Sequence, residues 1–191
     1  MSIFKANKKW LSVAQTAMSN AYNVQMEQRD IDFGRQLLSN IRQFRIEQAS
    51  LQEAEATIGE AQVSYMVENF QSKSAISKQI EEGYTYYLLK DDDGIVGYVG
   101  ICPKEEYLFL SKLYIRKEAR GKGFASKALA LVKDAAKENG LSRIQLTVNK
   151  GNTNSIEIYR NWGFETIDSV VTDIGKGFVM DDYVMELVLN T

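Results

Sequence analysis

The chain has 191 residues, of which 45% are hydrophobic, and its 23 basic residues nearly balance its 25 acidic residues. This composition is typical of one folded domain with a buried core, and no apolar run approaches the roughly 18 residues that a membrane span needs. The sequence has no histidine and a single cysteine, Cys102, which excludes a histidine-based catalytic triad, a Cys/His zinc site and an internal disulfide.

The charges are unevenly distributed along the chain. Lysines occur near the amino terminus, but polar residues interrupt the segment that follows, so we expect no signal peptide and a cytoplasmic location. Basic residues gather between positions 116 and 127, and acidic residues between 165 and 191. The first region suits an anionic ligand and the second a cationic one, whereas a nucleic-acid surface would need a broader basic excess.

The first part of the chain is expected to be helical. Apolar residues recur at helical spacing between positions 10 and 22 and again between 33 and 44. We therefore predict a helical extension over residues 1–43 and a main domain over residues 44–191. The extension could pack on the main domain or on another subunit, so a homodimer is one arrangement left open.

The next segment predicts a short strand, two helices and a hairpin. A strand is expected near residues 43–48, then a helix from Ser50 to Phe70 that Gly59 could break, and a second helix over residues 74–82. The period then changes from helical to extended. Strands over residues 84–89 and 95–101, joined by a turn, predict an antiparallel hairpin.

A strand, a helix and a strand follow the hairpin. The strand covers residues 107–115, the amphipathic helix residues 124–139, and the second strand residues 144–148. A connection of this length implies a right-handed crossover between parallel strands. A short helix through Asn161 and two closing strands, near 166–172 and 183–189, complete the chain.

The glycine-rich loop after residue 115 opens the amphipathic helix and predicts an anion site, because the first N–H groups of a helix lack partners within it. A Walker A loop is excluded because Gly123 follows Lys122 where serine or threonine is required. The dinucleotide fingerprint is excluded because Ser126 stands at its third glycine.

A third loop pattern, Arg or Gln, two residues, Gly, one residue, Gly or Ala, is met by Arg120, Gly123 and Ala125. With this loop, residues 44–191 resemble the GNAT superfamily of acetyl-CoA-dependent N-acetyltransferases. A second motif is similar to the family's Asn-x-x-Ala-Ile-x-x-Tyr-x-x-x-Gly-Phe, with serine in place of alanine. Its residues are Asn152, Ser155, Ile156, Tyr159, Gly163 and Phe164.

The resemblance implies an α+β fold, with a mixed, mostly antiparallel sheet that is splayed in the middle and has helices on both faces. It implies acetyl-CoA as cosubstrate, no metal, and an acceptor that is a small-molecule or peptide amine. No nucleic acid or membrane partner is expected. The implied coenzyme-binding residues are Leu113, Tyr114, Ile115, Arg120, Gly121, Lys122, Gly123, Phe124, Ala125, Ser126, Asn152, Ser155 and Tyr159.

Several of these residues have distinct expected roles. Loop amides can converge on a pyrophosphate because glycines let the backbone approach closely. The resemblance implies that backbone groups of Leu113 and Ile115 bind the pantetheine arm, and that Tyr159 protonates the departing thiolate as a general acid. Asn152 matches a coenzyme-contacting position, although asparagine is equally expected there as a helix cap.

The sequence leaves the general base open. Many family members place a glutamate on the strand before the loop, but Leu110, Ser111 and Lys112 stand in that part of the strand here. An amine acceptor has a pKa near roughly 10.4, so it must lose a proton before attack. The candidate bases, acting directly or through water, are Glu105, Glu106, Asp173, Asp181 and Asp182.

The acidic pair Asp181 and Asp182 lies in a segment Gly-Phe-x-x-Asp-Asp-Tyr that, with residues 65–70, is similar to PaiA-type polyamine acetyltransferases. The pair could receive a cationic amine, or it could be a solvated turn. Residues 48–65 are few for the two acceptor-side helices of that branch. Two functions therefore stay open: acetyl transfer to a primary amine by direct attack in a ternary complex, and a non-catalytic acyl-CoA-binding regulatory or interaction protein.

Overall fold

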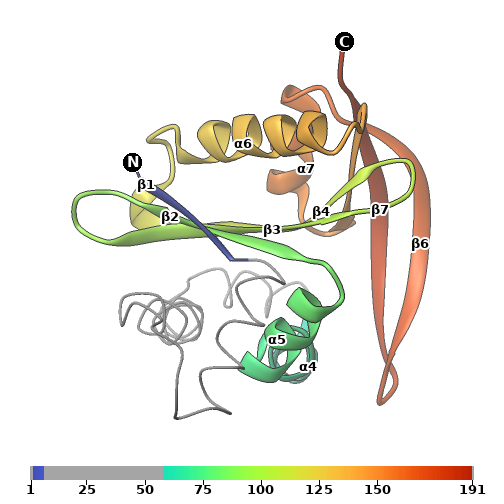
Figure 1. The fold of residues 1–191 in the computed structure, drawn as a ribbon. Helices are drawn as coiled ribbons and strands as arrows, with labels where there is room; N and C mark the ends of the chain where they lie inside the picture. The colour runs from blue at the N-terminus through green and yellow to red at the C-terminus, as the bar shows by residue number, and fades with distance from the viewer. Residues whose placement is uncertain (1, 7–57, 191) are drawn as a thin grey trace, which may run out of the picture.

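The computed structural model describes residues 2–6 and 58–190, which form a seven-stranded sheet with helices on both faces (Figure 1). The sheet order is β1-β2-β3-β4-β5-β7-β6. The predicted α+β class with a mixed sheet is confirmed. The strands are β1 (Ser2–Ala6), β2 (Thr85–Lys90), β3 (Ile95–Pro103), β4 (Leu108–Ile115), β5 (Arg143–Asn149), β6 (Glu165–Gly175) and β7 (Phe178–Val188), and the helices are α4 (Glu60–Gln71), α5 (Lys73–Glu81), α6 (Phe124–Glu138) and α7 (Thr153–Asn161).

Two hydrophobic clusters lie on opposite faces of the sheet. Buried residues of α6, including Ala128 and Val132, pack on one face with Leu110 of β4. On the other face Ile76 of α5 packs against Tyr86. Figure 1 shows α6 on the first face and α4 with α5 on the second.

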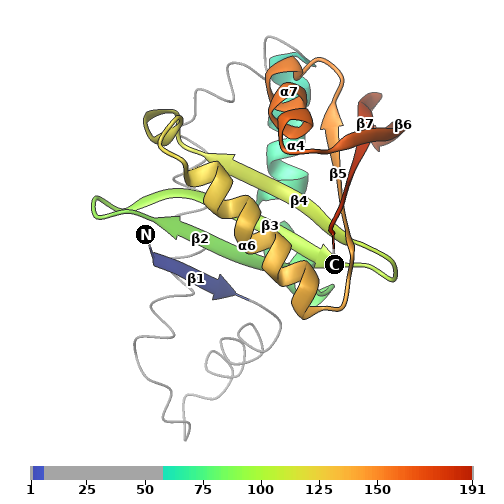
Figure 2. The ribbon, with the colours of Figure 1, turned by 90° about the horizontal axis from the view of Figure 1, so that it is seen from above.

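The sheet opens between β4 and β5, which are the only parallel pair among the strands of residues 2–6 and 58–190. These strands pair at Leu108 with Ile144 and at Phe109 with Gln145, and Figure 2 shows them diverging beyond that point. On its other edge β4 carries a bulge, because Gly100 lies opposite Lys112 while Ile101 lies opposite Leu110. The extra residue, Ser111, bends the strand. The predicted crossover and splay are thus both observed.

The amino-terminal strand β1 was not expected. It pairs antiparallel with β2, with Ser2 opposite Lys90, so these five residues extend the sheet that the sequence analysis assigned to the main domain. The helices predicted between residues 10 and 44 and the strand predicted near residues 43–48 lie outside the described residues. Gly59 does interrupt the next helical segment, with a φ of 84°.

The closing hairpin is longer than predicted, because each of its strands has 11 residues. Its tip packs on α4, where the Tyr65 hydroxyl donates to the Ile174 carbonyl at 2.7 Å. The rings of Tyr65 and Phe178 lie 5.4 Å apart. These tertiary contacts support the extended hairpin, which runs past the plane of the sheet in Figure 1.

Candidate active site

A cleft of about 860 Å³ opens where β4 and β5 diverge. Its walls come from α4, β4, the glycine-rich loop, β5, α7 and β7. Every predicted coenzyme-binding residue except Lys122 lines it. Lys122 instead lines a separate hollow of about 370 Å³ with Asp91, Asp93 and Arg116.

The glycine-rich loop lines this cleft and leads into the start of α6. Gly121 and Gly123 have φ values of 74° and 79°, in the left-handed region that glycine adopts without steric cost. Gly123 is the N-cap of α6 and has no side chain to cap it, whereas Ser72 caps α5 and Asn152 caps α7. The first amides of α6 are therefore available to an anion.

The two ends of the second motif have different local roles. The Asn152 side chain accepts a hydrogen bond from the Ser155 amide at 3.2 Å, so it acts as the cap that the sequence analysis weighed against a coenzyme contact. Both residues nevertheless line the cleft, at the start of α7.

Tyr159, on the last turns of α7, also lines the cleft. Its ring makes edge contacts with Trp162 and Phe164, at centroid distances of 5.8 and 5.6 Å, which hold the side chain in place. Burial, with a smaller effect of the Tyr114 phenol, raises the pKa of Tyr159 to about 12. The phenol therefore keeps its proton at neutral pH.

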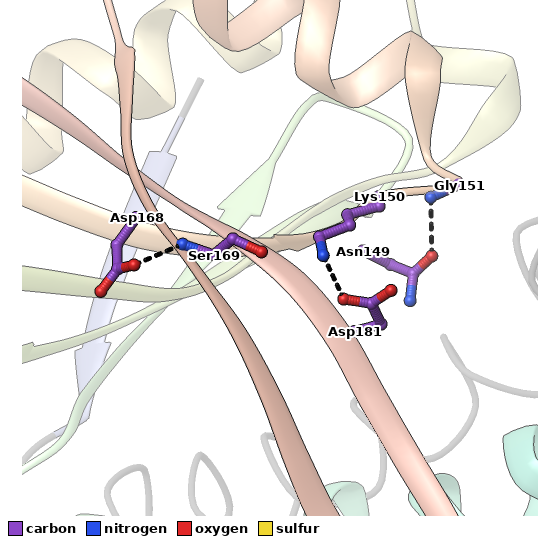
Figure 3. A network of polar contacts seen from close by, with 6 residues as sticks. All are labelled: Asn149, Lys150, Gly151, Asp168, Ser169 and Asp181. Carbon is purple, nitrogen blue, oxygen red and sulfur yellow. Dashed lines mark hydrogen bonds and ion pairs between the residues drawn. The ribbon is translucent and has the colours of Figure 1, made fainter.

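The side chains of Asp181 and Asp182 point to opposite faces of the sheet, because successive residues of a strand such as β7 alternate in direction. Asp182 is 7% exposed and lines the cleft, whereas Asp181 forms an ion pair with Lys150 at 2.5 Å (Figure 3). The Asn149 side chain accepts a hydrogen bond from the Gly151 amide at 2.9 Å and also forms a hydrogen bond with the Asp182 side chain. Burial and the neighbouring Asp181 raise the pKa of Asp182, opposed by the Asn149 hydrogen bond and Lys150.

The other predicted bases lie elsewhere. Glu105 and Glu106 are exposed in the turn between β3 and β4. Asp173 is exposed on β6, where its side chain accepts from the Gly175 amide at 2.8 Å. Asp182 is thus the one predicted acid that lines the cleft.

Several cleft residues were not predicted, among them Lys112. Burial lowers the pKa of Lys112 to about 8. Its position on the strand was noticed in the sequence, but only the bulge at Ser111 determines which face of the sheet its side chain takes. Other lining residues that were not predicted include Met66, Val67, Gln71, Tyr98 and Met180.

Within residues 2–6 and 58–190, no three His, Cys, Asp or Glu side chains gather as a metal site would require. None of the helices in the same ranges combines the length and apolar character needed to cross a bilayer.

The α+β sheet with a splayed centre, a glycine-capped helix start and a lining tyrosine defines an acyltransferase-like architecture. The model of the acetyltransferase (GNAT) family matches residues 48–164, which is more than half of the sequence. The chain belongs to this family, and the resemblance read from its motifs is confirmed.

Individual relatives agree with this assignment. The chain is 30% identical over 92 residues to the uncharacterized N-acetyltransferase YjgM of Escherichia coli (strain K12), a match that covers 46% of this chain and 55% of YjgM. The chain thus spans about half the length of this curated relative.

Solved structures show the same fold. A PaiA N-acetyltransferase from Thermoplasma acidophilum in complex with coenzyme A matches with a TM-score of 0.59 and 16% identity, covering 98% of this chain and 99% of that one. A GNAT family acetyltransferase from Elizabethkingia anophelis with acetyl-CoA bound matches with a TM-score of 0.52 and 18% identity, over 65% of this chain and 88% of that one.

Proposed function

We propose that this protein transfers an acetyl group from acetyl-CoA to a primary amine by direct attack in a ternary complex. The observation that carries the proposal is one cleft that brings together the α6 start, Tyr159 and Asp182. The amides that follow Gly123 would hold the pyrophosphate. The unpaired edge of β4 would receive the pantetheine arm, since β4 leaves β5 after Phe109.

The assigned residues account for each proton that the reaction releases or takes up. The acceptor ammonium gives one proton to Asp182, which passes it to solvent, and the amine then forms the N–C bond. The C–S bond breaks and the thiolate takes the Tyr159 proton. A second proton, lost from nitrogen as the amide forms, restores the phenol. The acceptor class is a small cationic amine, a polyamine or a peptide amine, because Asp182 is a buried acid that lines the cleft.

A non-catalytic acyl-CoA-binding protein is the competing function. It would require the coenzyme cradle but neither a proton donor nor an acid beside the acceptor. Tyr159 and Asp182 both line the cleft, which favours catalysis. An assay of acetyl transfer to a panel of amines and peptide amino termini tests the proposal, and acetyl-CoA binding without transfer to any acceptor would favour the competing function.

Replacing Asp182 with asparagine is expected to lower kcat/KM for the amine by about 10- to 100-fold, because a buried charge-assisted contact is lost. Burial raises the pKa of Asp182, so as the pH is lowered its carboxylate takes up a proton at a higher pH than an ordinary aspartate would. Wild-type activity should therefore begin to fall at that higher pH. That acid limb should be absent from the pH profile of the variant.

Asp181→Asn is the matched control, since Asp181 pairs with Lys150 and does not line the cleft. Its kcat/KM should stay within roughly threefold of wild type, as expected for a partly exposed ion pair. Equal losses in both variants would contradict the assignment of Asp182.

Cys102→Ala is expected to leave turnover unchanged. Cys102 is 3% exposed on β3, its thiol faces the Pro103 carbonyl at 3.7 Å, and it does not line the cleft. Mass spectrometry after incubation with acetyl-CoA should find no acetyl thioester on the protein. Loss of turnover in a folded Cys102→Ala variant would instead indicate a covalent intermediate.

A further inference from the structure

Lys112 lines the cleft from the face of the sheet opposite α6. Its neighbours on β4, Leu110 and Leu113, belong to the hydrophobic cluster under α6. The Lys112 ammonium instead lies 5.8 Å from the ring of Tyr86, which belongs to the cluster under α5. Lys112 therefore faces the opposite side of the sheet from the helix whose start forms the predicted pyrophosphate site.

The groups that the Lys112 ammonium contacts are neutral. It donates to the Gln79 side-chain carbonyl at 3.1 Å and lies 3.5 Å from the Ser111 hydroxyl. Among residues 2–6 and 58–190, no carboxylate pairs with it. The side chain is partly buried, and it lines the cleft.

Hydrogen bonds fix the orientation of the Gln79 side chain, so that its neutral carbonyl oxygen faces the Lys112 ammonium. Its amide nitrogen donates to the Phe70 carbonyl at 3.2 Å, and its side-chain oxygen also accepts from the Tyr86 hydroxyl. An amide oxygen cannot compensate a full positive charge, and a buried cation without a counter-charge is costly. Burial accordingly lowers the pKa of Lys112 to about 8, which still leaves most of it charged at neutral pH.

We propose that Lys112 binds an anionic group of the acceptor, so that the substrate is a primary amine that also carries a carboxylate or a phosphate. The inference rests on the proposed acetyl transfer and names the acceptor class of the same cleft. Asp182 on β7 supplies the one predicted acid of the cleft, and Lys112 on β4 supplies a partly buried cation. This pair of charges matches a zwitterion, whereas a polyamine would place a second cation near Lys112.

Matched acceptors that differ by one anionic group test the proposal. The pairs are lysine and cadaverine, tyrosine and tyramine, and ethanolamine phosphate and ethanolamine, the last of which separates phosphate from carboxylate recognition. With the wild-type protein, the anionic member of at least one pair should have a kcat/KM about 10- to 100-fold above its partner, as a charge-assisted hydrogen bond supplies.

The variant Lys112→Met keeps the length of the side chain and removes its charge. It should erase the preference by lowering kcat/KM for the acceptor that carries the anionic group, while the kcat/KM of the partner that lacks this group stays within about threefold of the wild-type value. Lys112→Arg should retain most of the preference. Equal losses for both members of a pair would overturn the proposal and assign Lys112 to the reacting carbonyl, and a wild-type preference for the diamine would overturn it too.

A binding measurement separates this inference from the proposed function. If the wild type acetylates no acceptor, the proposed transfer fails, and calorimetry with the protein saturated in coenzyme A then judges Lys112. Binding of lysine, tyrosine or ethanolamine phosphate to the wild type, weakened at least tenfold in Lys112→Met, supports the anion site. Affinities that do not differ between the two proteins, or binding to neither, overturn it.

Discussion

Gly123→Glu is expected to abolish acetyl-CoA binding, with an increase in Kd of at least about 100-fold, or roughly 3 kcal/mol. A Cβ at Gly123 would meet no atom within 4 Å, so the added side chain would occupy open space at the start of α6. Its carboxylate would stand beside the amides that are to hold the pyrophosphate, where it would compete for their hydrogen bonds and repel the phosphates. Calorimetry with acetyl-CoA measures the change.

Two controls separate this effect from backbone strain. Gly123→Ala imposes the same left-handed backbone without bulk or charge and should cost about 1 kcal/mol of stability. Gly140→Glu places a glutamate at another glycine of positive φ, 69°, beyond the opposite end of α6 and outside the cleft. Both variants should retain acetyl-CoA binding, and unchanged affinity in Gly123→Glu would rule out this loop as the pyrophosphate site.

Local patterns predicted most of the main domain because each element is encoded by nearby residues. The hairpin of β2 and β3 and helix α6 follow from period and turn residues, and their observed bounds differ from the predicted ones by at most two residues. Strand β1 could not be found in this way, because its extended form depends on pairing with β2, from Ser2 opposite Lys90 to Ala6 opposite Tyr86.

The site was predictable where a motif fixes the backbone and not where packing orients a side chain. Gly121 and Gly123 both have positive φ, and the motif requires glycine at Gly123, whereas Gly121 stands at one of its unspecified positions. Side chains of neighbouring strand residues point to opposite faces, so only one of Asp181 and Asp182 could enter the cleft. Which one enters is decided by the pairing of Asn149 with Asp182 across β5 and β7.

Lys112 illustrates how one extra residue hides a site from sequence analysis. Regular alternation from Leu110 would place Lys112 on the same face of the sheet as α6. The bulge at Ser111 reverses the order, so that Leu113 takes the α6 face and Lys112 lies near Tyr86 on the other. A bulge of this kind has no periodic signal, because it arises from the pairing of β4 with β3.

Tyr159→Phe is expected to lower kcat by about 100-fold or more, the usual contribution of a general acid, with little change in KM for acetyl-CoA. The variant keeps the ring that contacts Trp162 and Phe164, so the fold and the cleft should be preserved. Only the proton for the departing thiolate is lost. Single-turnover measurement of acetyl transfer separates this step from product release.

The pH profile distinguishes a proton donor from a structural tyrosine. Because burial raises the pKa of Tyr159 to about 12, its phenol stays protonated, and the wild-type rate should not fall through loss of that proton below about pH 11. Tyr114→Phe is the matched control, because Tyr114 lines the same cleft and is assigned no proton transfer. A loss of kcat in Tyr114→Phe equal to that in Tyr159→Phe, or full turnover in Tyr159→Phe, would contradict the role of Tyr159 as the acid.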